Sequence, residues 1–108
     1  MDTLTITEKH GANYILLELG GVISSYTFSD FRAKTYAYIK ENNLVLDLSQ
    51  IQSIDSSGLG VFMAAFNDAE DYGNTFYLMN PSVDALNAIN STGFTDTFNI
   101  IHSVTEVV

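Results

Sequence analysis

Two short apolar segments, residues 44–48 and 75–79, constrain the fold of this 108-residue chain more than any other feature. Each is almost wholly hydrophobic, which is typical of a strand that is buried on both faces of a sheet. Residues 57–72 lie between them and carry apolar side chains at helical spacing. Strands joined through a helix form a parallel pair with a right-handed crossover, so the centre of the chain is predicted to be α/β.

The flanking segments extend this pattern in both directions. Residues 4–7 alternate between apolar and polar side chains and residues 14–19 are mostly apolar, so they are expected to form an antiparallel hairpin. The same signals predict a helix over 29–40 capped by Ser29 or Asp30, a helix after Pro81, a strand at 98–101 and a short helix at 104–108. We therefore expect one α/β domain over residues 1–108, with a mixed, mainly parallel sheet, an N-terminal antiparallel hairpin and about four helices packed against the sheet.

Composition narrows the range of partners. Four Lys and Arg against 13 Asp and Glu give a net charge of −9, which argues against nucleic acid and membrane surfaces and suits basic protein partners. The absence of cysteine excludes disulfides, thiolate metal sites and cysteine nucleophiles. The first residues lack the pattern of a signal peptide, and no apolar run is long enough to span a membrane, so a cytoplasmic location is expected.

The residue patterns give no support to enzyme chemistry. His10 and His102 lie outside any metal-binding spacing, and neither a phosphate-binding glycine loop nor a serine nucleophile elbow is present. Asp68, Glu70 and Asp71 cluster late in the segment 57–72, where a solvated acidic face is a better interpretation than a metal site. We expect no enzymatic activity and no cofactor.

Residues 55–60 depart from the residue pattern that is expected at the start of a helix. Two glycines fall where the first turn of a helix should form, and each costs about 1 kcal/mol relative to alanine in a helix interior. The segment also follows a buried strand, where open α/β folds place their sites. Ser57 could be a plain N-cap that accepts from the amide of Leu59 or Gly60. It could instead carry a phosphoryl group, which the free amides and the dipole of the helix N-terminus would meet.

The conformation of Gly58 bears on the same question. If Gly58 is helical, its replacement by alanine is expected to be close to neutral or mildly stabilising. If the loop needs a positive φ at this position, the same change is expected to be clearly destabilising.

Asp55-Ser56-Ser57-Gly58-Leu59-Gly60-Val61 resembles the signature of the STAS domain, the fold of bacterial anti-sigma factor antagonists. The similarity continues through residues 19–21 with Thr27, 44–48, 80–82, 89–94, and Phe98 with 103–107. It therefore spans nearly the whole chain and implies a single STAS-like domain.

The resemblance implies a phosphorylation switch without catalysis in this chain. In such proteins the unphosphorylated form binds a serine kinase that is also the anti-sigma factor, and the sigma factor is released. Phosphorylation of the serine that precedes the first glycine abolishes binding, and a serine phosphatase reverses it. Carried over to this sequence, Ser57 is the acceptor, and the surrounding contact surface consists of Asp55, Ser56, Gly58, Leu59 and Gly60.

The turn after the second predicted strand departs from the family pattern. Members of the family usually carry Gly-Glu-(apolar)-Asp there, whereas this chain has Gly21-Val22-Ile23-Ser24. The change is either drift on a solvent-facing turn or altered partner choice, because Ser24 can donate as well as accept a hydrogen bond. Ser24 is therefore added to the candidate partner-binding residues.

Two other functions compete with the switch. The chain could be a constitutive STAS interaction subunit of a signalling or transport assembly, in which Ser57 is only a cap. Nucleotide binding by the loop is disfavoured, because no lysine or arginine lies between Lys40 and the C-terminus to meet phosphates.

Overall fold

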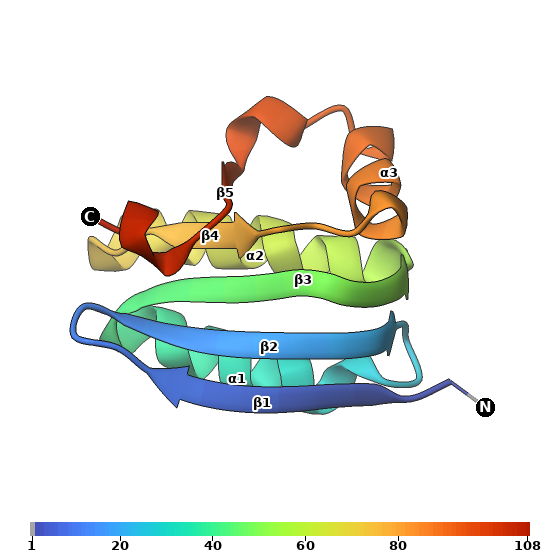
Figure 1. Cartoon of the computed structure of the whole chain (residues 1–108), viewed down its shortest axis with the longest axis horizontal. Helices are drawn as coiled ribbons and strands as arrows, with labels where there is room; N and C mark the ends of the chain where they lie inside the picture. The colour runs from blue at the N-terminus through green and yellow to red at the C-terminus, as the bar shows by residue number, and fades with distance from the viewer. Residues whose placement is uncertain (1) are drawn as a thin grey trace.

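Five strands form one mixed sheet in the order β1-β2-β3-β4-β5 (Figure 1). The computed structural model describes residues 2–108. Its elements are β1 (Leu4–His10), β2 (Tyr14–Ile23), α1 (Phe28–Glu41), β3 (Asn43–Ile54), α2 (Ser56–Tyr72), β4 (Phe76–Met79), α3 (Val83–Ser91) and β5 (Asn99–Ile101), with 3-10 helices at Thr95–Thr97 and Val104–Glu106.

The strand directions confirm the predicted topology. β1 pairs antiparallel with β2, and every later pair, β2 with β3, β3 with β4 and β4 with β5, is parallel. Each parallel connection runs through a helix, and α1 and α2 lie together behind the sheet in Figure 1. The expected helix count is wrong: within residues 2–108 there are three α-helices, and the segment predicted at 104–108 forms a single 3-10 turn.

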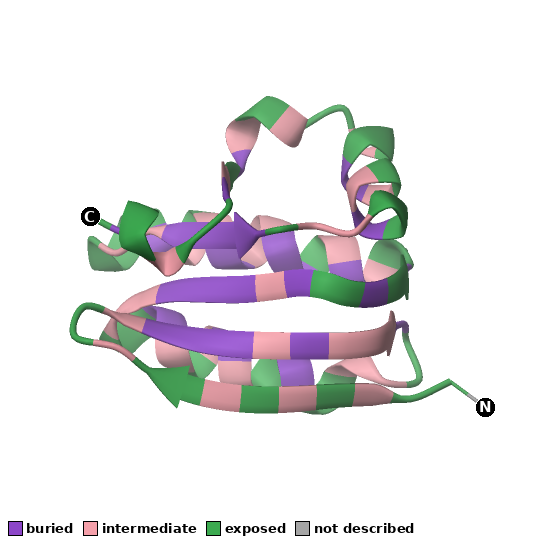
Figure 2. Cartoon of the chain, in the orientation of Figure 1, coloured by how far each residue is buried: buried purple, intermediate pink, exposed green. Residues whose placement is uncertain are grey.

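The core lies between the sheet and the helices. Alternate strand residues point to opposite faces of a sheet, so one side of each central strand packs under α1 and α2. Phe62 of α2 lies at the centre of this layer, with its ring 6.1 Å from that of Phe31, 6.2 Å from Phe76 and 6.3 Å from Phe98. Burial in Figure 2 follows the same division, with buried residues concentrated in β2, β3, β4 and the inner sides of the helices.

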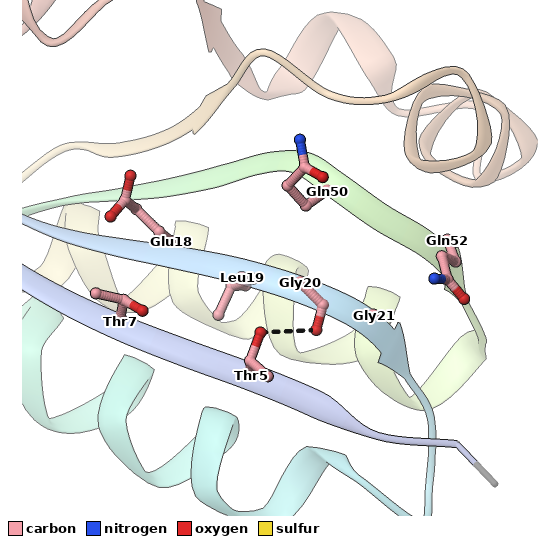
Figure 3. A pocket seen from close by; sticks show the side chains of 8 residues that line it. All are labelled: Thr5, Thr7, Glu18, Leu19, Gly20, Gly21, Gln50 and Gln52. Atoms are coloured by element: carbon pink, nitrogen blue, oxygen red, sulfur yellow. Dashed lines mark hydrogen bonds between the residues drawn. The ribbon is translucent and has the colours of Figure 1, made fainter.

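The opposite face of the sheet is only partly covered. A small second cluster beside the C-terminal segment consists of Leu16, Val45, Tyr77, Met79, Ile101 and Val107. Towards β1 this face becomes polar and encloses a shallow hollow of about 420 Å³ that includes Thr5, Thr7 and Gln50 (Figure 3). The sheet therefore has one thoroughly packed side and one side that is largely open to water.

Several predicted boundaries change, and those of β2, β3 and α1 bear on the site. β2 runs through Gly20 and Gly21, which were expected to end it, as far as Ile23. β3 continues past the expected end at residue 48 as far as Ile54. Leu48, Ile51 and Ile54 remain buried at every third position, because the pairing with β2 shifts register twice in this stretch. α1 begins at Phe28 with Thr27 at the N-cap position and no side-chain capping bond. The prediction that Ser29 or Asp30 caps this helix is therefore wrong, because both residues already lie inside its first turn.

Candidate functional site

The parallel pairing of β2 and β3 brings the predicted site residues together. Both strands end at the same edge of the sheet, where Ile23 pairs with Ile54. Residues 24–27, called here the β2–α1 loop, follow β2, and residues 55–60 follow β3. The backbone amide of Asp55 donates to the carbonyl of Ile23 over 3.0 Å and joins the two segments. Ser24 and the 55–60 motif, far apart in sequence, therefore occupy one edge of the molecule.

The N-cap of α2 is Asp55. Its backbone is extended, and its Oδ1 accepts from the amide of Ser57 at 2.9 Å and from that of Gly58 at 3.2 Å. The carboxylate also lies at the positive end of the helix dipole, which favours a negative charge. The interpretation of Ser57 as the N-cap is therefore wrong, because the cap lies two residues earlier, at Asp55, and the helix begins at Ser56.

Ser57 is left in the first turn of α2 with its hydroxyl outside the cap. The residue is half-buried, between the exposed Ser56 and the buried Gly58. Leu59 is half-buried and Gly60 is exposed, so the outer side of the first turn offers a small surface with few side-chain atoms.

Gly58 is helical, and yet it cannot accept a side chain freely. A Cβ at this position would lie 2.5 Å from Cγ2 of Ile23 and 2.8 Å from Cγ2 of Ile54. The expectation that a helical Gly58 would tolerate alanine is therefore wrong: the glycine is needed for the close approach of α2 to the ends of β2 and β3. Gly60 differs, since nothing lies within 4 Å of the position its Cβ would take.

The β2–α1 loop is closed by its own side chains. Ser24 is only 8% exposed, and its Oγ accepts from the amide of Tyr26 at 3.2 Å. The Thr27 hydroxyl accepts from the amide of Ser24 at 2.9 Å and donates to the carbonyl of Val22 at 2.7 Å. Ser24 therefore lies inside the turn, where its hydroxyl helps to hold the loop in shape.

Ser25 and Tyr26, which are not among the predicted site residues, also belong to this edge. The amide of Ser25 donates to Oδ2 of Asp55 over 3.0 Å, so the second oxygen of the capping carboxylate binds the loop. Tyr26, at the tip of the loop, is 93% exposed. The spacing Ser24-x-x-Thr27 is a local signal for such a closed turn, but nothing in the sequence places this loop beside residue 55.

Charge at the site comes from Asp55 alone among the residues of the loop and the motif. All four basic residues, Lys9, Arg32, Lys34 and Lys40, belong to β1 and α1.

Within residues 2–108, no three His, Asp or Glu side chains meet in a way that could hold a metal ion, including the acidic residues late in α2. Among the same residues, no helix has the length and apolar character needed to cross a membrane.

The chain folds as a small α/β domain in which the predicted site residues gather around the N-terminus of α2. The family model for the STAS domain matches residues 3–107, and the chain belongs to that family. A curated relative is the "Anti-sigma-B factor antagonist" of Bacillus subtilis (strain 168), which is 26% identical over 98 residues that make up 90% of each chain.

Solved structures agree with the fold. An anti-sigma factor antagonist from Mycobacterium paratuberculosis superposes with a TM-score of 0.81 at 18% identity, covering 95% of this chain and 89% of the other. SpoIIAA in its unphosphorylated form gives 0.78 at 17% identity, over 94% and 91% of the two chains. The Bacillus SpoIIAA in its phosphorylated form gives 0.73 at 17% identity, over 94% and 95%.

Proposed function

We propose that this protein is an anti-sigma factor antagonist that is switched by phosphorylation of Ser57. In its unphosphorylated form it binds an anti-sigma factor that is also a serine kinase, and the sigma factor is released. Phosphorylation of Ser57 ends this binding, and a serine phosphatase restores it. The chain supplies the binding surface and no catalytic group. The role named for the Bacillus subtilis relative supports the proposal, as does a phosphorylated form among the structural neighbours.

The observation that carries the proposal is the position of the N-cap. A serine that caps a helix has its hydroxyl committed to backbone amides, and a kinase could reach it only after the first turn had opened. Here the Asp55 carboxylate serves as the cap, so the Ser57 hydroxyl is not needed to hold the helix. Ser57 is also partly exposed on an outer surface with little side-chain bulk, between Ser56 and Gly60.

The electrostatics of the site explain how a phosphate would act. A phosphoserine adds about −1.5 to −2 charges at neutral pH. The amides of Ser57 and Gly58 already donate to Asp55, and no basic residue belongs to either segment of the site. The added charge would therefore remain largely unneutralised at the surface, where it repels an acidic or apolar partner patch. Because the whole chain already carries −9, the effect is local.

The first test is tandem mass spectrometry of the protein isolated from its own cells under growth and stress conditions. We expect a phosphoryl group on Ser57 in a fraction of the molecules and its absence in the Ser57→Ala variant. If every molecule is unmodified in all conditions, the switch is refuted, and a constitutive interaction subunit replaces it as the better interpretation.

The second test is calorimetric titration with each purified anti-sigma factor kinase of the source cells. Ser57→Ala is expected to bind as the unmodified protein does, while Ser57→Asp is expected to lose binding. Ser91→Asp is the matched control, because it adds the same charge at an exposed position in the last turn of α3, outside the proposed contact surface, and should bind as the unmodified protein does. Equal binding by Ser57→Ala and Ser57→Asp would contradict the proposal.

A further inference from the structure

The Asp55 carboxylate is shared between two parts of the site. Its Oδ1 binds the first turn of α2 through the amides of Ser57 and Gly58, and its Oδ2 binds the β2–α1 loop through the amide of Ser25. Among the side-chain hydrogen bonds of residues 2–108, the bond from Ser25 is the one that links this loop to the phosphorylatable segment. The remaining bonds of the loop close the turn on itself or return to β2.

We propose that Asp55 couples the chemical state of Ser57 to the conformation of the β2–α1 loop, and so to the position of Tyr26. The inference rests on the proposed function only in taking Ser57 as the modified residue. It adds a regulatory step: phosphorylation releases a second segment of the binding surface as well as adding charge to the first. Asp55 is a positioning residue in this scheme.

A phosphate on Ser57 would compete with the Asp55 carboxylate at the N-terminus of α2, and this competition is the physical reason for the coupling. A phosphate on Ser57 is a dianion attached to the residue whose own amide binds Oδ1 of Asp55. Phosphate and carboxylate repel one another, and both can accept from the first-turn amides of Ser57 and Gly58, which bind Oδ1 in the unmodified protein. Movement of the carboxylate away from the phosphate removes the acceptor of the Ser25 amide. The backbone bond from the Asp55 amide to the Ile23 carbonyl does not involve the carboxylate and remains.

Tyr26 is the residue of the loop that a partner protein would contact. Its side chain is 93% exposed, and its backbone amide is fixed inside the turn by the Ser24 hydroxyl. Large aromatic side chains that are held in place before binding are typical anchors of protein interfaces. The internal bonds of the turn remain when the Ser25 bond is lost, but the loop is then no longer held to the Asp55 carboxylate. Binding would then have to order the loop and this ring relative to α2.

The test compares the full chain with and without phosphoserine installed at position 57 during synthesis, using amide hydrogen exchange followed by NMR. We expect the Ser25 amide to exchange roughly tenfold faster or more in the phosphorylated protein, the ratio that the loss of one hydrogen bond to a charged acceptor produces. The Asp55 amide is the internal control and should keep its protection. Unchanged exchange at Ser25 would overturn the proposal, whether or not cells phosphorylate Ser57.

Two further proteins separate coupling from simpler effects. In Asp55→Asn a single carbonyl oxygen replaces the two carboxylate oxygens, so the Ser25 amide should already exchange fast and phosphoserine at 57 should add little. Phosphoserine at Ser91, an exposed residue in the last turn of α3, adds the same charge outside the site and should leave the Ser25 amide unchanged. If phosphoserine at position 91 accelerated exchange of the Ser25 amide as much as phosphoserine at position 57 does, the effect would be due to net charge and the coupling would be refuted.

Discussion

Replacement of Gly58 by alanine sets two effects of similar size against each other. Alanine is favoured over glycine by about 1 kcal/mol in a helix interior, and less near a helix end. Against this gain, the new methyl group would lie 2.5 Å from Cγ2 of Ile23 and 2.8 Å from Cγ2 of Ile54. Neither contact is with the far end of a flexible side chain, because both atoms are branches on Cβ of stiff isoleucines at strand ends.

The steric effect should win. Ile23 is fully buried, and forcing extra atoms into a packed core costs about 1–3 kcal/mol. Subtracting a helical gain of at most about 1 kcal/mol leaves Gly58→Ala less stable than the natural protein by up to about 2 kcal/mol. For a domain of this size, this corresponds to a fall in Tm of up to roughly 15 °C.

Gly60→Ala is the matched control, because it lies in the same helix turn and its Cβ would meet nothing within 4 Å. It should be as stable as the natural protein or more stable, by up to about 1 kcal/mol. Urea denaturation of the three proteins at one temperature measures the difference directly. If Gly58→Ala matched Gly60→Ala in stability, the argument from close approach would be refuted.

Two other substitutions test features away from the site. The Thr35 hydroxyl is wholly buried and has no hydrogen-bond partner within residues 2–108. Thr35→Val should therefore raise the free energy of unfolding, measured by urea denaturation, by about 1 kcal/mol. A loss of stability would show that the hydroxyl has a hydrogen-bond partner. Hydrogen bonds from Lys34 and Tyr38 hold the pKa of Glu8 below its usual value. Ionised Glu8 therefore stabilises the fold above its unfolded-state pKa, and this contribution disappears as the pH falls through the folded-state pKa. Calorimetric melting should show a lower Tm for Glu8→Gln at pH 7 and convergence with the natural protein in acid; a gap independent of pH would contradict this.

The sequence was sufficient to predict the architecture of the sheet. The apolar segments at 44–48 and 75–79 predicted parallel strands, because a strand that is covered on both faces has no polar side. The structure confirms this prediction, since β3 and β4 pair in parallel. Pairing of β2 with β3 follows from the same topology, and it brings Ser24 beside residues 55–60 without any local signal.

The details of the cap could not be predicted from the sequence. Asp55, Ser56 and Ser57 are all good capping residues, and the choice among them depends on the residue at which the backbone turns helical. β3 runs on to Ile54, and this places Asp55 in the extended conformation that the N-cap requires. The steric role of Gly58 depends in the same way on the approach of α2 to two strand ends, a distance that no local pattern encodes.

The open side of the sheet gives the molecule a place where a reporter can be attached. Thr7 lies on β1 beside the polar hollow and is exposed, on the face turned away from the main core (Figure 3). Because the natural chain has no cysteine, Thr7→Cys would introduce its sole thiol. A fluorophore attached there could be followed in binding experiments while every side chain of the Ser57 site keeps its natural identity.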